Sequence, residues 1–459
     1  MAKTSLSGFP EWLPSQRLIE QHFLNVLQNT FELHGFSSIE TRAVEPLSEL
    51  TRKGETSKEV YLLSRLQAAP GENEDPRKQL GLHFDLTVPF ARYVLEYAGQ
   101  LTFPFKRYQI QKVWRGERPQ EGRFREFIQA DIDVVGDGKL PLHYDAELPL
   151  IMHEALSALP IPPVLLHVSN RKVAQGFYTT IGVAEESLIE VLRVVDKLDK
   201  IGPEAVAQEL EETVGLSATQ AQLALQMAGI TASNGAELEA KLRTLLEQAG
   251  LEANELLEQG VAELAGVLEV AARRRPGALI ADLKIARGLD YYTGTVYESE
   301  LIGHEDLGSI CSGGRYDSLA SNGKRSFPGV GLSIGVSRLL ARVIGAGLVQ
   351  VTRPVPTAVL VAVTDEDSRP VSEAVADKLR ARGICADVAP TAAKFGKQIK
   401  FADKRGIPFV WFPAGVDEAA SSGADSVKDI RSGEQVEADA ATWQCPEQDL
   451  RVQVTAARV

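Results

Sequence analysis

FKRYQIQKVWRGERPQEGRFREFIQADIDVVG, residues 105–136, is the charged stretch around which the chain is organised. Apolar residues mix with polar ones before residue 115, and the mixture resumes after residue 126. This pattern predicts two antiparallel strands joined by a polar loop. Such a hairpin brings Arg115, Arg123 and Arg125 near one another, and converging guanidinium groups suggest a bound polyphosphate. A charged, solvent-facing hairpin is the ordinary alternative for arginines that stand alone.

The bulk composition sets limits on the class of protein. The chain has 459 residues, 44% of them hydrophobic and 24% charged, which is enough for about three globular domains. A formal net charge of −13 argues against a protein that coats nucleic acid, so RNA binding is expected only at local basic patches.

The cysteines and the apolar runs indicate where the protein works. Cys311, Cys385 and Cys445 are widely spaced and form no Cys-x-x-Cys pair, so neither a disulfide framework nor a metal site is predicted. The N-terminus carries no apolar leader, and no stretch is long enough to span a bilayer. We therefore expect a soluble, cytoplasmic protein with no membrane partner.

Three elements are predicted ahead of the hairpin. Apolar residues at three- and four-residue spacing over 15–33 predict an amphipathic helix that stops at Gly35, and a strand is expected over 39–44. A second strand is expected over 81–89, with Asp85 and Thr87 on one face. A carboxylate beside a hydroxyl can hold an ammonium group, although a polar edge facing solvent fits the pattern equally well.

The amino-acid composition changes twice after residue 184. Residues 185–275 are rich in Ala, Leu, Glu and Gln with Leu at helical intervals, which predicts a helical insertion. After a linker at 352–356, short apolar strands alternate with helices, which is typical of a separate α/β domain. Its second helix, near 393–404, places four lysines roughly on one face, either as ordinary solvated charges or as an RNA-binding patch: Lys394, Lys397, Lys400 and Lys404.

The charged stretch resembles motif 2 of the class II aminoacyl-tRNA synthetases through Arg115-x-Glu117, the string GRFREF and a Gln-x-Asp-x-Asp strand. The resemblance implies that Arg115 binds the α-phosphate of ATP, Glu117 the adenine side and Arg123 the distal phosphates. Residues 329–340 resemble motif 3, which places Arg338 on the γ-phosphate. The helix and strand near the N-terminus correspond to motif 1, the dimer interface, although Arg42 stands where the family usually has proline.

A second string, ARGLDYYTGTVYE at 286–298, resembles a sequence peculiar to histidyl-tRNA synthetases. The resemblance assigns Arg287 to the α-phosphate and the reacting carboxylate, which makes Arg287 and Arg115 the expected catalytic residues. It places Tyr291, Tyr292 and Tyr316 in the histidine pocket, and it gives Asp85 and Thr87 the α-amino group.

The imidazole ring of histidine needs an acceptor for one N–H and a partner for its other nitrogen. Asp133 and Tyr292 are the expected partners, and Gln129, on the same strand face as Asp133, is expected to orient the substrate.

The resemblance covers nearly the whole chain and implies an α/β protein with an α+β catalytic core. It implies an antiparallel sheet with flanking helices (1–184 and 276–350), the helical insertion (185–275) and a C-terminal α/β anticodon-binding domain (357–459). The expected activity is that of a histidine–tRNA ligase, a homodimer that uses ATP with Mg²⁺, L-histidine and histidine tRNA.

Contacts with tRNA are expected from Arg118 and Gln120 at the hairpin tip and from Lys394 and Lys397 in the tail domain. The alternative is a non-catalytic, histidine-sensing paralogue that resembles the regulatory subunit of ATP phosphoribosyltransferase. Such paralogues tend to lack the tail domain and the intact string around Arg287.

Overall fold

The computed structural model describes residues 6–51, 59–67, 75, 78–120, 122–285, 291–414 and 423–457. The chain divides into two compact units, residues 1–10 with 24–345 and residues 11–23 with 346–459. Among the helices described, none combines the length and the apolar character needed to cross a membrane.

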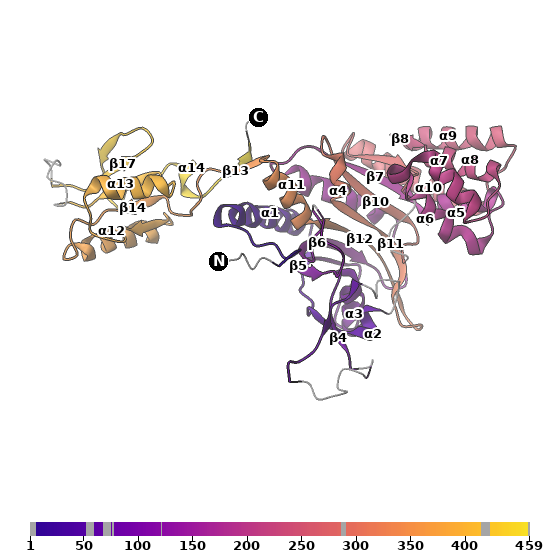
Figure 1. Cartoon of the computed structure of the whole chain (residues 1–459), viewed down its shortest axis with the longest axis horizontal. Coiled ribbons are helices and arrows are strands. Elements are labelled where there is room, and N and C mark those ends of the chain that lie inside the picture. Colours follow the sequence, from indigo (N-terminus) through magenta and orange to yellow (C-terminus); the bar gives the residue numbers. More distant parts are fainter. Residues whose placement is uncertain are drawn as a thin grey trace. The chain divides into compact units, whose positions relative to one another are not determined.

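The first unit is built on a nine-stranded, mostly antiparallel sheet (Figure 1). The strand order is β1 (Ser37–Ser38), β5 (Phe105–Trp114), β6 (Glu126–Val135), β12 (Ser326–Gly335), β11 (Cys311–Ser321), β10 (Thr295–Leu301), β7 (Val164–Asn170), β9 (Leu279–Asp282) and β8 (Thr231–Ala232). The predicted hairpin of residues 105–136 is confirmed as β5 and β6, which are paired along their full lengths.

Helices cover both faces of this sheet. On one face, α3 (Thr87–Tyr97) packs Phe90 and Val94 against Tyr316 and Phe327. On the other face, Asp145 of α4 (His143–Ser157) binds the guanidinium of Arg315, with 2.6 Å between Oδ2 and Nη2. Neighbouring residues on a strand point to opposite faces, so the side chain of Arg315 binds α4 on one face and that of Tyr316 packs against α3 on the other.

The N-terminal helix is confirmed as α1 (Pro14–Leu33), followed by Gly35 with a left-handed φ of 78°. The strand predicted over 39–44 is wrong in its bounds: only β1 joins the large sheet, whereas β2 (Val44–Pro46) belongs to a separate small sheet. Side chains explain the change, because Gln109 Nε2 donates to the hydroxyl of Thr41 and Gln111 Nε2 donates to the Thr41 carbonyl. These bonds replace the backbone ladder beside β5.

The strand predicted over 81–89 is also wrong. β4 (Leu80–Leu82) pairs with β2 and β3 (Leu62–Leu63), and α3 has begun by Thr87. The Asp85 carboxylate accepts the N–H of Val88 at 3.1 Å, as side chains at helix starts often do, and Pro89 is tolerated in a first helical turn because it lacks an N–H. The short helix α2 (Leu47–Leu50) follows β2.

A group of helices follows β7 and gathers beyond the β8 end of the sheet (Figure 1). These are α5 (Arg171–Thr180), α6 (Leu188–Val195), α7 (Leu198–Glu212), α8 (Ala218–Ala228), α9 (Gly235–Ala249) and α10 (Glu255–Arg274). The backbones of α5 and α10 pass so close that a side chain would not fit between them. A Cβ on Gly176 would lie 2.5 Å from the nitrogen of Leu257, and one on Gly260 would lie 2.6 Å from that of Val173. Glycine at both positions lets the backbones meet.

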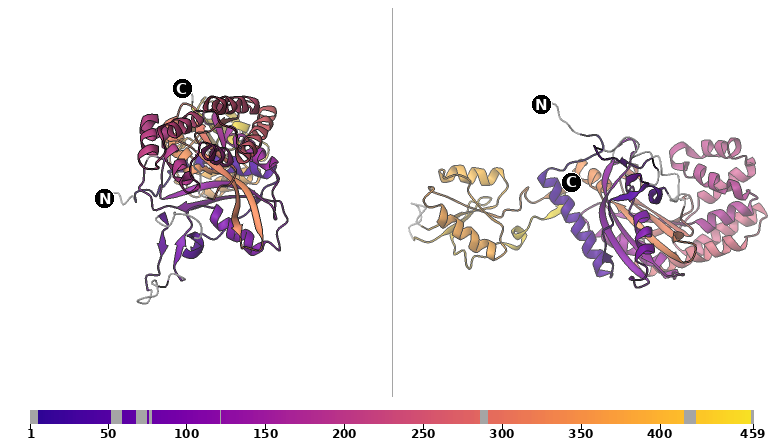
Figure 2. Two further views of the ribbon diagram at one scale, coloured as in Figure 1. Left: turned by 90° about the vertical axis from the view of Figure 1, so that its right-hand side faces the viewer. Right: turned by 90° about the horizontal axis from the view of Figure 1, so that it is seen from below.

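The second unit contains a five-stranded sheet whose helices lie on opposite faces (Figure 2). Its strand order is β15 (Ala386–Val388), β14 (Val359–Val361), β16 (Phe409–Phe412), β17 (Ser426–Asp429) and β18 (Gln435–Glu437). Leu379 of α12 (Arg369–Ala381) and Ala402 of α13 (Phe395–Lys404) belong to different cores, one on each face. β13 (Val349–Val351) pairs with β19 (Val454–Ala456), close to the chain's end.

Candidate active site

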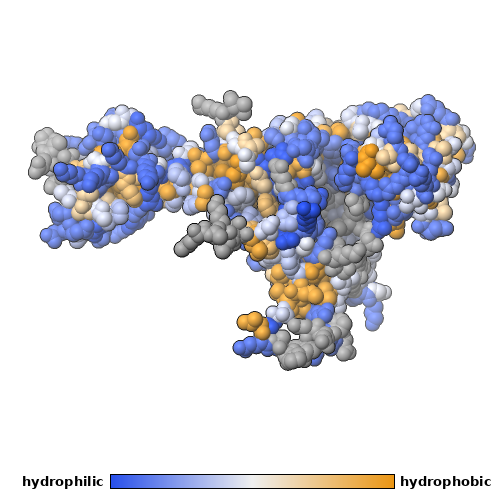
Figure 3. Space-filling model, in the orientation of Figure 1, coloured by the Kyte–Doolittle hydropathy of each residue, from blue (hydrophilic) through white to orange (hydrophobic). Residues whose placement is uncertain are grey.

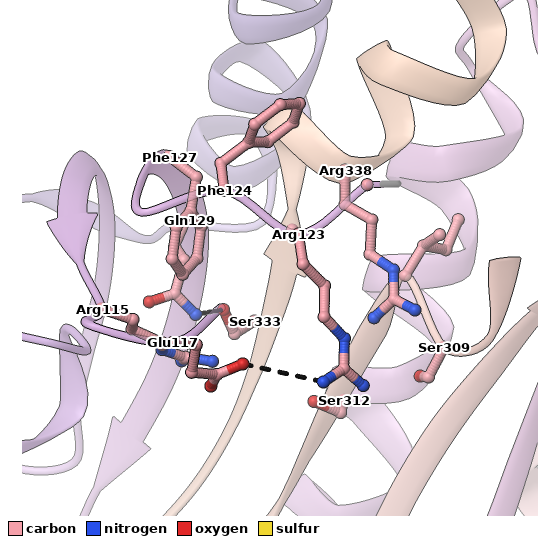
Figure 4. Close-up of a pocket in the computed structure, with 13 residues that line it drawn as sticks. Arg115, Glu117, Arg123, Phe124, Phe127, Gln129, Ser309, Ser312, Ser333 and Arg338 are labelled. Atoms are coloured by element: carbon pink, nitrogen blue, oxygen red, sulfur yellow. Dashed lines mark hydrogen bonds and ion pairs between the residues drawn. The ribbon is translucent and has the colours of Figure 1, made fainter. Parts of the chain in front are cut away.

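A pocket of about 260 Å³ lies in the first unit where the β5–β6 loop meets β11, β12 and the start of α11 (Val336–Gly345). This volume is just below the range that is usual for a small-molecule site. Figure 4 shows the lining residues, which are Arg115, Glu117, Gly122, Arg123, Phe124, Phe127, Gln129, Ser309, Ile310, Ser312, Ser333, Gly335 and Arg338. We call this the phosphate pocket, because its three arginines and one glutamate give its lining a net charge of +2.

Each arginine of the phosphate pocket is held by the protein. Arg115 Nε donates to the Phe84 carbonyl at 3.0 Å, and its guanidinium lies 5.0 Å from the ring centre of Phe127. Arg123 Nη1 lies 3.6 Å from Glu117 Oε2, the ion pair drawn in Figure 4. Anchored guanidinium groups keep donors available for phosphate oxygens.

Arg338 is the third arginine of the phosphate pocket. Its Nη2 donates to the Leu307 carbonyl, while its buried Nε has no partner among the described residues. Burial and the nearby charge of Arg123 lower the pKa of Arg338. A Cβ on Gly122, whose φ is +68°, would lie 3.1 Å from Arg338 Cγ, so the loop glycine lets the two segments meet. An anion between Arg123 and Arg338 would relieve their repulsion.

Beside the phosphate pocket, the same face of the sheet carries a group of buried polar residues. We call Asp85, Arg107, Asp131 and Asp133 the acidic cluster; each is at most 4% exposed. The register places Arg107 opposite Asp133 and Gln109 opposite Asp131. Gln129, which also lines the phosphate pocket, donates from Nε2 to Ser333 Oγ at 2.8 Å and so lies between the two regions.

Burial dominates the electrostatics of the acidic cluster. It raises the pKa of Asp85 to about 7, that of Asp131 to about 6 and that of Asp133 to about 7. Asp85 Oδ2 and Gln129 Oε1 are buried acceptors without partners among the described residues. Buried carboxyl groups with raised pKa values regain their charge when a cation binds, so this region suits an ammonium group.

Three tyrosines lie beside the acidic cluster, and we call the cluster and these tyrosines together the acidic chamber. The rings of Tyr291 and Tyr292 lie 4.9 Å apart, and those of Tyr291 and Tyr316 lie 6.1 Å apart. Tyr316 donates its hydroxyl to Asp133 Oδ1 at 2.7 Å. Glycines make room for the rings: a Cβ on Gly329 would lie 2.5 Å from the Tyr316 ring, and one on Gly314 would lie 2.9 Å from the Tyr292 ring.

The predicted residues do not all meet in one place. Arg115, Glu117, Arg123, Gln129 and Arg338 line the phosphate pocket, whereas Arg125 turns away and donates from Nε to the Glu117 carbonyl. Arg118 and Gln120 are exposed in the loop outside the lining, and Lys394 and Lys397 are exposed at α13 of the second unit. Arg287, with the rest of 286–290, lies outside the described residues.

Arg107 and the role of Asp131 were missed by sequence reasoning. Part of the signal was available, because polar residues at alternate positions of both strands, 107, 109 and 111 on one and 129, 131 and 133 on the other, indicate one polar face of the sheet. That this face is covered by α3 does not follow from the alternation. Within the described part of the chain, no group of three or more His, Cys, Asp or Glu residues is arranged to hold a metal ion.

Comparisons with known proteins show the family to which the chain belongs. The family described as "Histidyl-tRNA synthetase" matches residues 8–339, and that described as "Anticodon binding domain" matches residues 357–442. "Histidine--tRNA ligase" of Micrococcus luteus is 59% identical over 99% of both chains, and that of Bifidobacterium longum subsp. infantis is 58% identical over 97% of both.

Solved structures give the same result. The "Crystal structure of histidyl-tRNA synthetase from Nostoc sp. PCC 7120" is 38% identical, with a TM-score of 0.83 over 96% of this chain and 97% of that one. A Bacillus halodurans protein titled "ATP phosphoribosyltransferase regulatory subunit/histidyl-tRNA synthetase" shares the fold at 18% identity, with a TM-score of 0.70. The predicted fold class and family are thus confirmed: the chain belongs to the histidyl-tRNA synthetase family, the histidine–tRNA ligases.

Proposed function

We propose that this chain activates L-histidine with ATP and passes the histidyl group to the 3′ end of histidine tRNA. The observation that carries the proposal is the adjacency, on one face of the sheet, of the cationic phosphate pocket and the acidic chamber, joined at Gln129. In the first step, the histidine carboxylate attacks the α-phosphorus of ATP and the bond to pyrophosphate breaks. In the second, a terminal ribose hydroxyl of the tRNA attacks the histidyl carbonyl, its proton is lost, and AMP leaves. Catalysis comes mainly from positioning and from fixed positive charge.

In the phosphate pocket, Arg115 binds the α-phosphate, Arg123 and Arg338 bind the distal phosphates, and Glu117 accepts from the adenine amino group. The net charge of +2 in the pocket lining supports this assignment. Mg²⁺ would be held through the ATP phosphates, because Glu117 is the only acidic group among the described lining residues. Its chemistry would be to neutralise phosphate charge.

In the chamber, Asp85 and Thr87 take the α-ammonium group of histidine, and the unpartnered Asp85 Oδ2 supports that role. Asp133 accepts a ring N–H, Tyr292 partners the other nitrogen, and Gln129 orients the substrate. Tyr291 and Tyr316 form the walls. For Arg287 the proposal rests on the resemblance alone: it joins Arg115 at the α-phosphate and the reacting carboxylate.

The tRNA is proposed to contact Arg118 and Gln120 near the acceptor end and α13, through Lys394 and Lys397, near the anticodon. We also propose a homodimer in the cytoplasm. Apolar side chains exposed around β3 and β4 support a contact between copies (Figure 3): Leu62, Leu63, Leu66 and Leu80. The proposed functional division is 1–184 with 276–350 for catalysis, 185–275 for the insertion and 357–459 for the anticodon.

Pyrophosphate exchange into ATP tests the proposal. Exchange should require L-histidine, and discrimination of about 10⁴ or more against other amino acids is expected, since a polar chamber rejects ligands that leave its groups unpaired. Asp85→Asn should weaken histidine binding without changing ATP binding. Exchange with a different amino acid would refute the substrate assignment, and histidine binding without exchange would favour a sensing role.

A further inference from the structure

Arg107 is a buried cation without a role in the mechanism above. Its side chain is 0% exposed, and its Nη2 lies 2.7 Å from Asp133 Oδ2 and 4.0 Å from Asp131 Oδ2. Its guanidinium carbon lies 4.3 Å from the ring centre of Phe90, which closes the site from α3. A buried cation next to two carboxyl groups controls how many protons those groups hold.

Both oxygens of Asp133 are held in place. Oδ2 faces Arg107 and Oδ1 accepts from Tyr316, each at 2.7 Å. The space beyond Oδ1 belongs to β12, where a Cβ on Gly331 would lie 2.0 Å away. A carboxylate oxygen has two lone pairs, so each oxygen of Asp133 can accept one further hydrogen bond in a fixed direction.

We propose that Arg107 is a specificity-determining positioning residue: it keeps Asp133 ionised and oriented, so that Asp133 accepts an N–H from the neutral imidazole ring of histidine. The inference rests on the proposed contact between Asp133 and the ring. An ionised carboxylate only accepts, whereas a protonated carboxyl donates, so its charge selects which ring edge it meets. Arg107 acts on the substrate through Asp133 and does not touch it.

The direction of the pH effect follows from the groups around Asp133. Burial raises its pKa to about 7, the charge of Asp131 adds to that rise, and Arg107 opposes it. The other titratable groups facing this region are Asp85 and Arg115 together with Tyr291, Tyr292 and Tyr316. Without the cation, the pKa of Asp133 rises further, and the carboxyl is protonated at neutral pH.

The experiment compares wild type, Arg107→Met and Arg107→Lys by the pH dependence of kcat/KM for histidine in pyrophosphate exchange. The acid limb should move to higher pH by about one unit or more in Arg107→Met, which is roughly a tenfold loss on that limb that recovers as the pH is raised. Arg107→Lys should restore much of the profile because it keeps the charge. The KM for ATP should stay within about twofold in both variants. A loss of equal size at every pH would overturn the proposal.

A double-mutant cycle keeps the test valid if Arg107→Met folds poorly. Asp133→Asn and Arg107→Met/Asp133→Asn are compared, and the double variant removes both members of the 2.7 Å pair while Asp131 stays in place. If Arg107 acts through Asp133, adding Arg107→Met to Asp133→Asn should change the KM for histidine by no more than about twofold. Additive losses would overturn the inference about Arg107. An Asp133→Asn protein with normal histidine KM would instead refute the proposed role of Asp133.

Discussion

The Nε of Arg115 donates a 3.0 Å hydrogen bond to the carbonyl oxygen of Phe84, the residue that precedes Asp85. One bond therefore ties the side chain proposed for the α-phosphate to the backbone that carries the carboxylate proposed for the α-ammonium. The two reactants must meet with their reacting atoms about 3–3.5 Å apart, so a fixed link between their binding groups favours the reaction.

This link predicts that Arg115→Lys loses more than a change of charge would suggest. Lysine keeps the positive charge, but its single ammonium nitrogen cannot donate to the Phe84 carbonyl and also make two parallel hydrogen bonds to phosphate, as a guanidinium group can. Adenylate formation in a single turnover should fall roughly 10²-fold, with a smaller change in ATP affinity. The matched control is Arg125→Lys. Arg125 donates from Nε to the Glu117 carbonyl but does not itself line the phosphate pocket. Equal losses in both variants would assign the effect to the loop and not to the phosphate contact.

The raised pKa of Asp85 predicts a pH-dependent cost to stability. The folded value is about 7, whereas an unfolded Asp titrates near 3.9, so the folded state binds more protons between about pH 4 and pH 7. Stability from this group therefore falls as the pH rises through that window. Ligand-free Asp85→Asn should match wild type at pH 4 and exceed it at pH 8 by about 1 kcal/mol or more. Thermal unfolding at the two pH values measures the difference.

Histidine should reverse this order. Its ammonium group stabilises the ionised form of Asp85, so saturating histidine should raise the Tm of wild type at pH 8 and leave Asp85→Asn almost unchanged. A variant with the same stability difference at pH 4 and pH 8 would contradict the buried-carboxylate explanation. Equal stabilisation of both proteins by histidine would remove Asp85 from the ammonium site.

The hairpin shows how far sequence reasoning reaches. The mixture of apolar and polar residues predicted β5 and β6, and the resemblance to motif 2 predicted a shared site for Arg115, Glu117 and Arg123, all three of which line the phosphate pocket. Local hydrogen bonds were harder to foresee. The bond from Val88 to Asp85 starts a helix where alternation had predicted a strand, and such side-chain bonds leave no periodic pattern.

Buried charge was the other limit. Arg107 is followed by Tyr108, Gln109 and Ile110, so apolar and polar residues are mixed around it. This mixture does not say which face of the strand is covered. The burial of Arg107 depends on Phe90 from α3, which reaches the site only after the chain has turned at Asp85. A side chain whose role depends on a distant element cannot be placed from its own neighbours in sequence.

The loop residues Arg118 and Gln120 predict a separation of the two half-reactions. Both are exposed, and neither lines the phosphate pocket. Arg118→Ala and Gln120→Ala should lower kcat/KM for tRNA by about tenfold, because they remove contacts to phosphates or base edges, and should spare pyrophosphate exchange. Lys112→Ala, an exposed β5 residue paired with Glu126, serves as the control. If the variants lowered the rates of tRNA charging and of pyrophosphate exchange equally, Arg118 and Gln120 would belong to the ATP site.

The lysines of α13 give a prediction about salt. Lys394 and Lys397 are exposed, and Lys400 and Lys404 continue the charged face along the same helix. If Lys394 and Lys397 each contact a phosphate of a single-stranded anticodon loop, each replacement with Ala should lower the steepness of log affinity against log salt by about 0.7. Binding of histidine tRNA measured at several salt concentrations gives that steepness directly.

The control for the salt measurement is Lys378→Ala, an exposed lysine on α12, the helix that covers the opposite face of the same sheet. It changes the net charge of the protein by the same amount as either α13 variant, so it reports the general effect of charge. Lys394→Ala and Lys397→Ala should weaken tRNA binding at low salt far more than Lys378→Ala, and all three proteins should form histidyl adenylate at the wild-type rate. If the three variants gave the same salt dependence, α13 would be an ordinary solvated helix and the anticodon contact would have to lie elsewhere in the second unit.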